Sequence, residues 1–360
     1  MKHHYKHIDS LRGIAVLFVI WLHVSEKYIN LSTTLKENGS WLYDIALYLN
    51  FGRIGVVIFF AISGFVLLKS INGVKEFIIK RFFRLYPLFW LSVILGIYII
   101  YLFGGAVSFD KVVANLTMLP LMFNQDMVLG LYWTLEAELF FYFIGLLLFI
   151  FKASNKPINL FLISIVFLVF FVIDKKFNLL NPEHTGFIVL PLNLAIMFWG
   201  ALYRYIYDNP NISINIFNKE IKVKLLFIIL TISIIILPLM IFFKGVIDMN
   251  FRYTKFGISY ILGISIFILL STKFKIYNRI LVWIGTISYS LYLFHPIVFN
   301  YLFWWLQNYA PKEFKEFDLS IYLIINLILS IILASLSYYL IEKPSIKYSY
   351  YLINQKSKKD

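Results

Sequence analysis

The stretch from Leu225 to Phe243 reads LLFIILTISIIILPLMIFF and carries no charged side chain over nineteen residues. As a helix rising 1.5 Å per residue, it would cross the roughly 30 Å hydrocarbon core of a bilayer. A second uncharged run, LSIYLIINLILSIILASLSYYL, extends from Leu319 to Leu340. Similar runs recur along the chain, separated by short polar breaks that contain lysine or arginine. We therefore predict a polytopic membrane protein, an all-α helical bundle.

The composition excludes several other classes of protein. Of 360 residues, 61% are hydrophobic, whereas about half are apolar in a soluble domain. The net charge is +14, but the basic residues flank the apolar runs instead of forming a basic stripe on one face, so we expect no nucleic-acid partner. The chain has no cysteine, and with few clustered ligands we expect no metal site.

The apolar runs define about ten predicted membrane helices and an orientation. The helices lie near 12–28, 44–68, 85–104, 129–151, 157–173, 187–203, 225–243, 256–271, 281–306 and 319–341. Both termini then share one side, which holds 22 of the 33 lysines and arginines, so the positive-inside rule predicts cytoplasmic termini. We expect one membrane domain over 1–345 and a basic cytoplasmic tail over 346–360, in the inner (cytoplasmic) membrane.

Arg12 and His23 are the first polar residues that need an explanation within a predicted span. They are eleven residues apart, about three helical turns, so they face the same side with roughly 16 Å between them along the axis. Histidine is the natural general base near neutral pH. The pair is explained equally well if Arg12 is an ordinary basic residue flanking the span and His23 lies at the membrane interface. We expect His3, His4 and His7, in the N-terminal tail, to be solvated.

Two further groups of charged residues lie near predicted spans. Arg81 and Arg84, in the predicted loop after the second span, share one face at i,i+3 and suit either phosphate groups or anionic lipids. Glu136 and Glu138 in the fourth span point to nearly opposite faces, so only one of them faces the bundle interior. That glutamate either has a chemical role or pairs with an intramembrane arginine.

The ninth span carries a polar stripe of Ser288, Tyr292 and His295 at i, i+4 and i+7, which must face protein or water. Interhelical hydrogen bonds explain the first two, whereas His295, followed by Pro296, is a functional candidate or a partner at a kink. In the second span, Ser63-Gly64 predicts close helix packing.

These motifs, in this order, resemble those of the acyltransferase-3 family, whose bacterial members O-acetylate lipopolysaccharide, capsule, peptidoglycan and other glycans. The resemblance runs from Ile8 to Pro344. It rests on Asp9-Ser10-Leu11-Arg12-Gly13 with His23, Gly55 to Phe65, Arg81-x-x-Arg84-x-x-Pro87, Trp133-Thr134-Leu135-x-x-Glu138, Ile287 to Pro296, and Ile341-Glu342-Lys343-Pro344.

The chain departs from the family pattern in two places. The family commonly has an aspartate where this chain has Val57. Many members also carry a C-terminal SGNH hydrolase-like domain, which we do not expect here. The protein would then complete the transfer alone or pass the acyl group to a separate periplasmic protein.

The resemblance implies acetyl-CoA, or another acyl-CoA, as the donor and a glycan or lipid-linked saccharide as the acceptor. On this hypothesis Arg12, Arg81 and Arg84 hold the nucleotide phosphates, and His23 is the general base that Glu138 orients or whose imidazolium it stabilises; an acyl-histidine relay is the alternative. The remaining predicted contacts are Ser63 lining the active site, Trp133 lining the mouth through which the acceptor enters, and Tyr292 and His295 donating to the thioester oxygen.

Two other function classes fit buried polar groups in a membrane bundle. A transporter or flippase for a glycolipid or small molecule also buries charges, but the paired broken helices typical of that class are not evident. A purely structural scaffold leaves the same-face pair Arg12 and His23 unexplained. In each case membrane lipids surround the protein.

Overall fold

The computed structural model describes residues 5–31, 40–180, 185–216 and 218–356, and within them the chain is almost entirely helical. Nine helices in this part of the chain are long and apolar enough to cross a membrane, and a bent helix pair raises the number to ten if it forms one span. This confirms the predicted all-α polytopic bundle. His3 and His4, predicted to be solvated, lie outside the described residues.

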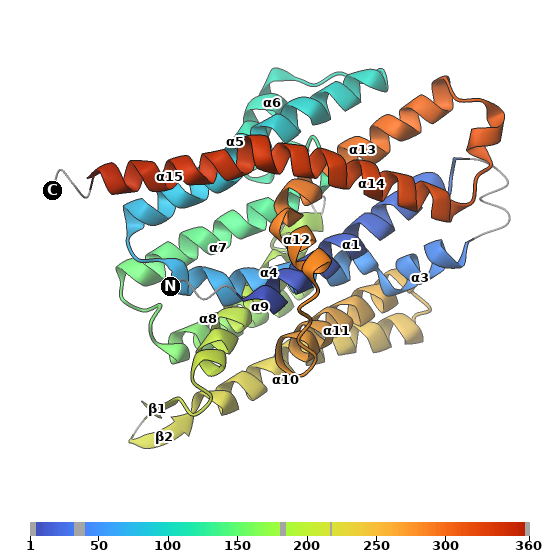
Figure 1. The fold of residues 1–360 in the computed structure, drawn as a ribbon. Coiled ribbons are helices and arrows are strands. Elements are labelled where there is room, and N and C mark those ends of the chain that lie inside the picture. Colours follow the sequence, from blue (N-terminus) through green and yellow to red (C-terminus); the bar gives the residue numbers. More distant parts are fainter. Residues whose placement is uncertain (1–4, 32–39, 181–184, 217, 357–360) are drawn as a thin grey trace. The chain divides into compact units, whose positions relative to one another are not determined.

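The chain folds into two compact units that are interleaved along the sequence. Unit 1 comprises Met1–Gly55, Ile78–Leu131 and Leu269–Asp360, and unit 2 comprises Val56–Phe77 and Tyr132–Ile268. The helices of unit 1 are α1 (Lys6–Tyr28), α3 (Trp41–Leu49), most of α5 (Val74–Leu102), α6 (Phe109–Leu116), α12 (Arg279–Thr286), α13 (Ser288–Asn308), α14 (Leu319–Ser337) and α15 (Lys343–Lys356) (Figure 1).

The first half of α1 lies against α12 with the two backbones in direct contact. A methyl group added at Gly13 would lie 2.5 Å from the carbonyl oxygen of Leu281, and one added at Gly285 would lie 1.8 Å from that of Asp9. Only glycine allows this approach, as at other close helix crossings in membranes. The crossing fixes where α1, and therefore His23, lies relative to α12.

The second half of α1 packs between α13 and α14. His23 contacts His295, and five residues later the ring of Tyr28 contacts that of Phe303, so α1 and α13 run in the same direction. The Tyr28 hydroxyl also donates to the side-chain oxygen of Asn326, which is buried on α14. These contacts connect α1 to both helices through buried polar side chains.

Two helices predicted as continuous are broken. The predicted helix over 44–68 ends at Asn50, which adopts φ 53° and accepts a hydrogen bond from the backbone N–H of Arg53, so α4 (Phe51–Leu67) starts afresh. Asparagine tolerates this left-handed conformation better than other side chains do. The predicted helix over 281–306 bends by 75° at Ile287, between α12 and α13.

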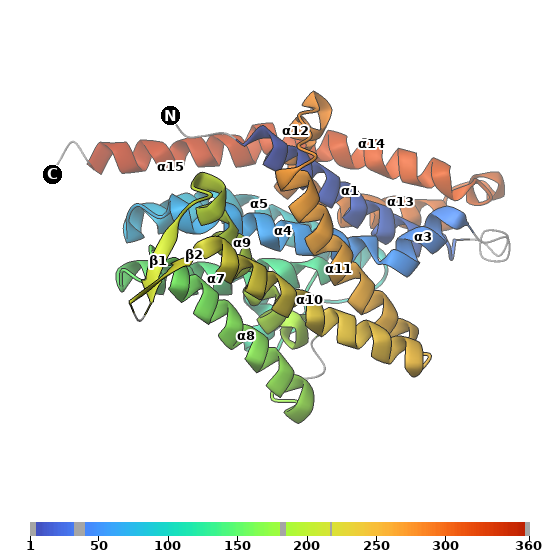
Figure 2. The ribbon, with the colours of Figure 1, turned by 90° about the horizontal axis from the view of Figure 1, so that it is seen from below.

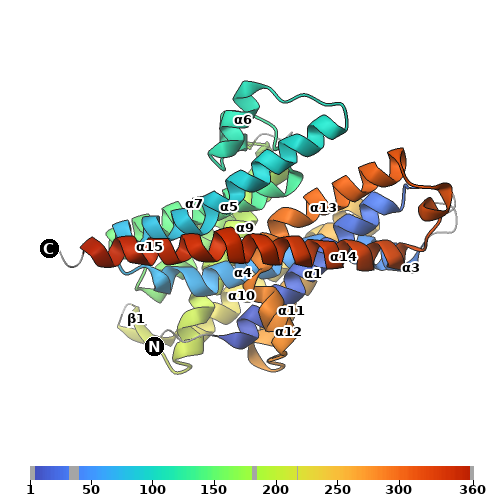
Figure 3. The ribbon, with the colours of Figure 1, turned by 45° about the horizontal axis from the view of Figure 1, so that its top comes forward.

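The last predicted helix is longer than one span. After α14 a π-helical turn, Tyr338–Glu342, leads directly into α15, and the helices form one long rod (Figure 3). Residues 346–356, predicted as part of a basic tail, are therefore helical. His7 differs from the prediction too, because it is buried with its ring edge-on to Tyr277 and is not solvated.

Unit 2 contains most of α4 together with α7 (Trp133–Ile150), α8 (Pro157–Phe177), α9 (Thr185–Asp208), α10 (Val223–Ile247) and most of α11 (Phe251–Thr272). Helices α8, α9 and α10 pack on one another (Figure 2). An unpredicted antiparallel hairpin, β1 (Ser213–Ile216) and β2 (Lys219–Lys222), connects α9 to α10 with Ser213 opposite Lys222.

Helices α4 and α9 cross closely, as the Ser63-Gly64 pair predicted. A methyl group added at Gly64 would lie 1.8 Å from the Met197 carbonyl oxygen, and one added at Gly200 would lie 2.2 Å from that of Ala61. The two glycines therefore bring the backbones together from both sides. This crossing accounts for the small residues in the second predicted span.

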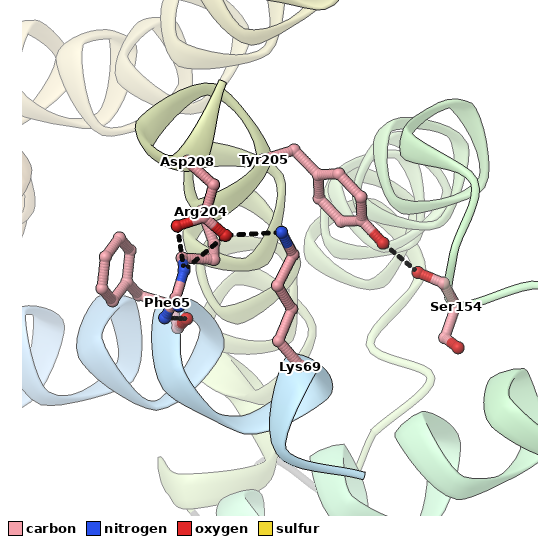
Figure 4. Close-up of polar contacts among 6 residues, drawn as sticks. All are labelled: Phe65, Lys69, Ser154, Arg204, Tyr205 and Asp208. Carbon is pink, nitrogen blue, oxygen red and sulfur yellow. Dashed lines mark hydrogen bonds and ion pairs between the residues drawn. The ribbon is translucent and has the colours of Figure 1, made fainter. Parts of the chain in front are cut away.

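A charged cluster fixes the end of α9 to the end of α4 (Figure 4). The Asp208 carboxylate lies 2.6 Å from Lys69 Nζ and 2.8 Å from Arg204 Nε. Arg204 also lies over the ring of Phe65, 4.9 Å from its centroid, and donates to the backbone carbonyl of the same residue. The single Asp208 carboxylate therefore pairs with both cations at the end of the helices.

Candidate functional site

Two histidines from distant parts of the sequence meet inside unit 1. His23 Nδ1 on α1 lies 3.0 Å from His295 Nε2 on α13, and the ring planes are parallel to within 6° with centroids 5.3 Å apart. His295 is fully buried, whereas His23 is partly exposed. One histidine can therefore meet a reactant while the other only contacts protein.

The surroundings of His295 occupy both of its nitrogens. Its Nδ1 lies 3.2 Å from the backbone oxygen of Leu291, and its Nε2 faces His23. The nearby Tyr292 hydroxyl donates to the carbonyl of Leu131 at 3.3 Å. Both side chains therefore have partners within the protein, and donation by Tyr292 and His295 to a thioester oxygen stays a prediction.

Arg12 lies on the same unbroken helix as His23. Since α1 is helical from Lys6 to Tyr28, the eleven-residue spacing puts Arg12 and His23 on one side, about 16 Å apart along the axis. Arg12 Nη1 is 3.2 Å from the carboxylate of Asp9, one turn earlier. The Asp9 carboxylate, on the same helix, thus orients the Arg12 guanidinium.

Arg81 and Arg84 lie within α5 and not in a loop as predicted, because that helix begins at Val74. The charge of Arg84 acts on the carboxylate of Glu342, which is buried and accepts a hydrogen bond of 2.6 Å from the hydroxyl of Ser290. Tyr289 on α13 donates to the carbonyl of Leu85, next to Arg84. The start of α13 is therefore tied to α5 beside this arginine.

The glutamates of α7 lie in unit 2. Glu138 accepts hydrogen bonds from the hydroxyls of Ser63 at 3.1 Å and Tyr142 at 2.5 Å. Glu136 is more deeply buried, with 1% of its surface exposed. Trp133, at the start of α7, packs edge-on against Phe60. Orientation of His23 by Glu138 stays a prediction.

An apolar cavity of about 460 Å³ lies elsewhere in unit 1, between α1, α3 and α14. It is lined by residues such as Leu17, Phe18 and Trp21, with the Ser320 hydroxyl as a polar exception. At 100° per residue these α1 side chains point away from the face that carries Arg12 and His23. The cavity offers no acid or base, so we place the candidate chemistry at the histidine pair.

The polar residues that the sequence did not single out as site residues are Asp9, Tyr142, Ser290 and Glu342. Asp9, Ser290 and Glu342 lie within the family motifs quoted above, and this position in the motifs could have marked them as candidate site residues. In the described part of the chain, no group of three or more histidine, aspartate or glutamate side chains is arranged to hold a metal ion.

Comparison with known proteins places the chain in a class of enzymes. The family described as "Acyltransferase domain" matches residues 5–340, nearly the whole chain, and the protein belongs to this acyltransferase-3 family. It is a membrane-embedded, acyl-transferring enzyme. The chain is 24% identical over 309 residues, 82% of this chain and 84% of the relative, to a protein of Acidianus two-tailed virus named "Putative acetyltransferase ORF330". No solved structure matches it.

Proposed function

We propose that the protein transfers an acyl group, most simply acetyl, from cytoplasmic acyl-CoA to a hydroxyl of a cell-surface or exported glycan, with His23 as the general base. The observation that carries the proposal is a partly exposed His23 hydrogen-bonded to a buried His295 in a member of an acyltransferase family. A histidine within a membrane span needs a function or a partner, and His23 is placed to have both.

Three arginines are the proposed binding residues for the acyl-CoA donor. Arg12 lies about three helical turns from His23, on the side predicted to be cytoplasmic. Guanidinium groups bind phosphates in a bidentate manner, and Arg12, Arg81 and Arg84 are the candidates for the CoA phosphates. An extended pantetheine arm would then place the thioester near His23.

The acceptor hydroxyl enters from the outer side in this scheme. His23 takes the hydroxyl proton, the oxygen forms a bond to the thioester carbon, and the carbon–sulfur bond breaks. The thiolate of CoA leaves with the proton that His23 returns, so the products are an O-acyl glycan and CoA. A lipid-linked saccharide is the acceptor best suited to a site within the membrane, and a separate periplasmic acceptor protein is the alternative.

Replacing His23 by alanine tests the assignment of the base. Surface polysaccharide from a deletion strain, complemented with the wild type or with His23→Ala, would be compared by mass spectrometry. We expect the acyl mass only with the wild type, while His23→Ala is made at wild-type levels and elutes as a folded protein. Full acylation by the variant would remove His23 from the mechanism.

The same strains separate the enzyme from a transporter. A transporter or flippase would leave acylation of the glycan intact and change the amount exported. In the purified protein, Arg84→Ala should raise the apparent KM for acyl-CoA more than that for the acceptor. An unchanged donor KM would exclude Arg84 from the phosphate site.

A further inference from the structure

We propose that His295 is a positioning residue that fixes the tautomer of His23, with the proton on Nδ1 and the lone pair on Nε2. His23 then takes the substrate proton through Nε2 alone. This inference rests on the proposed function and deepens it, because it assigns the reacting nitrogen and gives His295 the orienting role.

The backbone carbonyl of Leu291 can only accept a hydrogen bond. His295 Nδ1 lies 3.2 Å from this oxygen and therefore carries a proton. In a neutral imidazole the other nitrogen, Nε2, is then an acceptor. It lies 3.0 Å from His23 Nδ1, so that atom must be the donor, and His23 Nε2 keeps its lone pair.

The other proton arrangements are costly at this place. The opposite tautomer of His295 would set the Nδ1 lone pair against the lone pairs of the Leu291 oxygen at 3.2 Å. Protonating both nitrogens would put a positive charge on a side chain with no exposed surface. The neutral form with a proton on Nδ1 avoids both penalties.

Pro296 strengthens this arrangement. A proline has no backbone N–H, so Pro296 leaves the carbonyl of Tyr292, four residues earlier, without its helical donor. Pro296 therefore removes a backbone N–H donor from the turn of α13 in which His295 Nδ1 faces the Leu291 carbonyl, and leaves acceptors there instead.

The far side of His23 is open toward a glycine. A methyl group added at Gly52 would lie 3.8 Å from His23 Nε2, so a longer side chain at that position would cover the nitrogen. Glycine leaves this side of the ring accessible, and His23 as a whole is partly exposed. The lone pair assigned above therefore belongs to the nitrogen that a hydroxyl can approach.

The series of hydrogen bonds from His23 through His295 ends at the backbone carbonyl of Leu291. A carbonyl oxygen cannot pass a proton on, so a proton that His23 receives on Nε2 has no exit through His295. It must leave through Nε2 again. The recipient is the sulfur of the departing CoA, which is the proton balance that the transfer reaction requires.

Nitrogen-15 NMR of the histidine-labelled, purified protein tests the inference directly, since the two tautomers give distinct ring-nitrogen shifts. The chain has six histidines, and signals are assigned by removing His23 or His295. We expect His23 protonated on Nδ1 in the wild type and in His295→Gln, whose side-chain oxygen can still accept. In His295→Leu, of similar size but without an acceptor, this signature should disappear.

Activity gives the second readout. We expect kcat to fall about 100-fold in His295→Leu, within the range that a positioned general base contributes, and to recover most of that loss in His295→Gln. The KM for acyl-CoA should not change in either variant. If His295→Leu does not fold, the wild type and His295→Gln still decide the question.

The outcomes distinguish this inference from the proposed function. A wild-type His23 protonated on Nε2, or a His23 tautomer unchanged in His295→Leu, would overturn the positioning role whatever the activity. The expected tautomer, together with full acyl transfer by His23→Ala, would instead overturn the proposed function and leave the proton assignment in place.

Discussion

Gly285→Ala should separate the two histidines although it touches neither. The added methyl group would lie 1.8 Å from the carbonyl oxygen of Asp9, about 1.2 Å inside the 3.0 Å that real side-chain carbons keep. The atom it meets is backbone, so no side chain can turn away. Helix α1 must therefore move relative to α12 by about 1 Å.

That movement reaches the site because the helices are stiff and their connection is short. Asp9 and His23 lie on one unbroken helix, and a single residue, Ile287, joins α12 to α13, which carries His295. A misplacement of about 1 Å lowers turnover by about 100-fold when reacting groups must be aligned. We expect that loss in kcat, together with a destabilisation of about 1–3 kcal/mol from overpacking.

The assay compares purified Gly285→Ala with Gly73→Ala, a glycine whose added methyl group meets no atom within 4 Å. Acyl transfer and thermal unfolding are measured for both in the same detergent. Gly73→Ala should match the wild type in turnover and midpoint. If Gly285→Ala also matched it, the close approach of α12 to α1 would not determine the position of His23.

Two further substitutions test the fold. Asp208→Asn removes the anion between Lys69 and Arg204 and should lower the stability of unit 2 by about 1 kcal/mol. The loss should be smaller at high salt, because these groups are partly exposed and salt screens their attraction. An unchanged thermal unfolding midpoint at low salt would show that the ion pairs contribute nothing to stability. Asn50→Val forces a branched side chain to φ 53° and should lower the midpoint of thermal unfolding, whereas Asn50→Gly should not. Equal midpoints for the two variants would contradict the idea that a left-handed residue is needed between α3 and α4.

The membrane helices could be predicted from the sequence because their length is set by the bilayer and their ends by charged residues. The breaks within them could not be predicted as easily. Asn50 and Ile287 sit inside apolar stretches, and a window long enough to detect a span averages over the single residue that ends a helix. Asn50 did carry a signal, since asparagine is among the few residues that readily adopt a left-handed conformation.

Only part of the candidate site could be predicted from the sequence. The spacing of Arg12 and His23 is local, so helix geometry alone is enough to place them on one side. The partner of His23 lies 272 residues away, and the periodicity of α13 marked His295 as buried without saying what it faces. The roles of Ser290 and Glu342 likewise depend on contacts between distant segments.

The interleaving of the two units has a consequence for biosynthesis. The first and last segments of unit 1 enclose the whole of unit 2 in the sequence, so the histidine pair cannot form until α13, in the last third of the chain, has been made. At about 5–20 residues per second, the ribosome needs roughly 15–50 s to travel from His23 to His295. For that time α1 resides in the membrane with its polar face uncovered, and a chain released early would be inserted but inert.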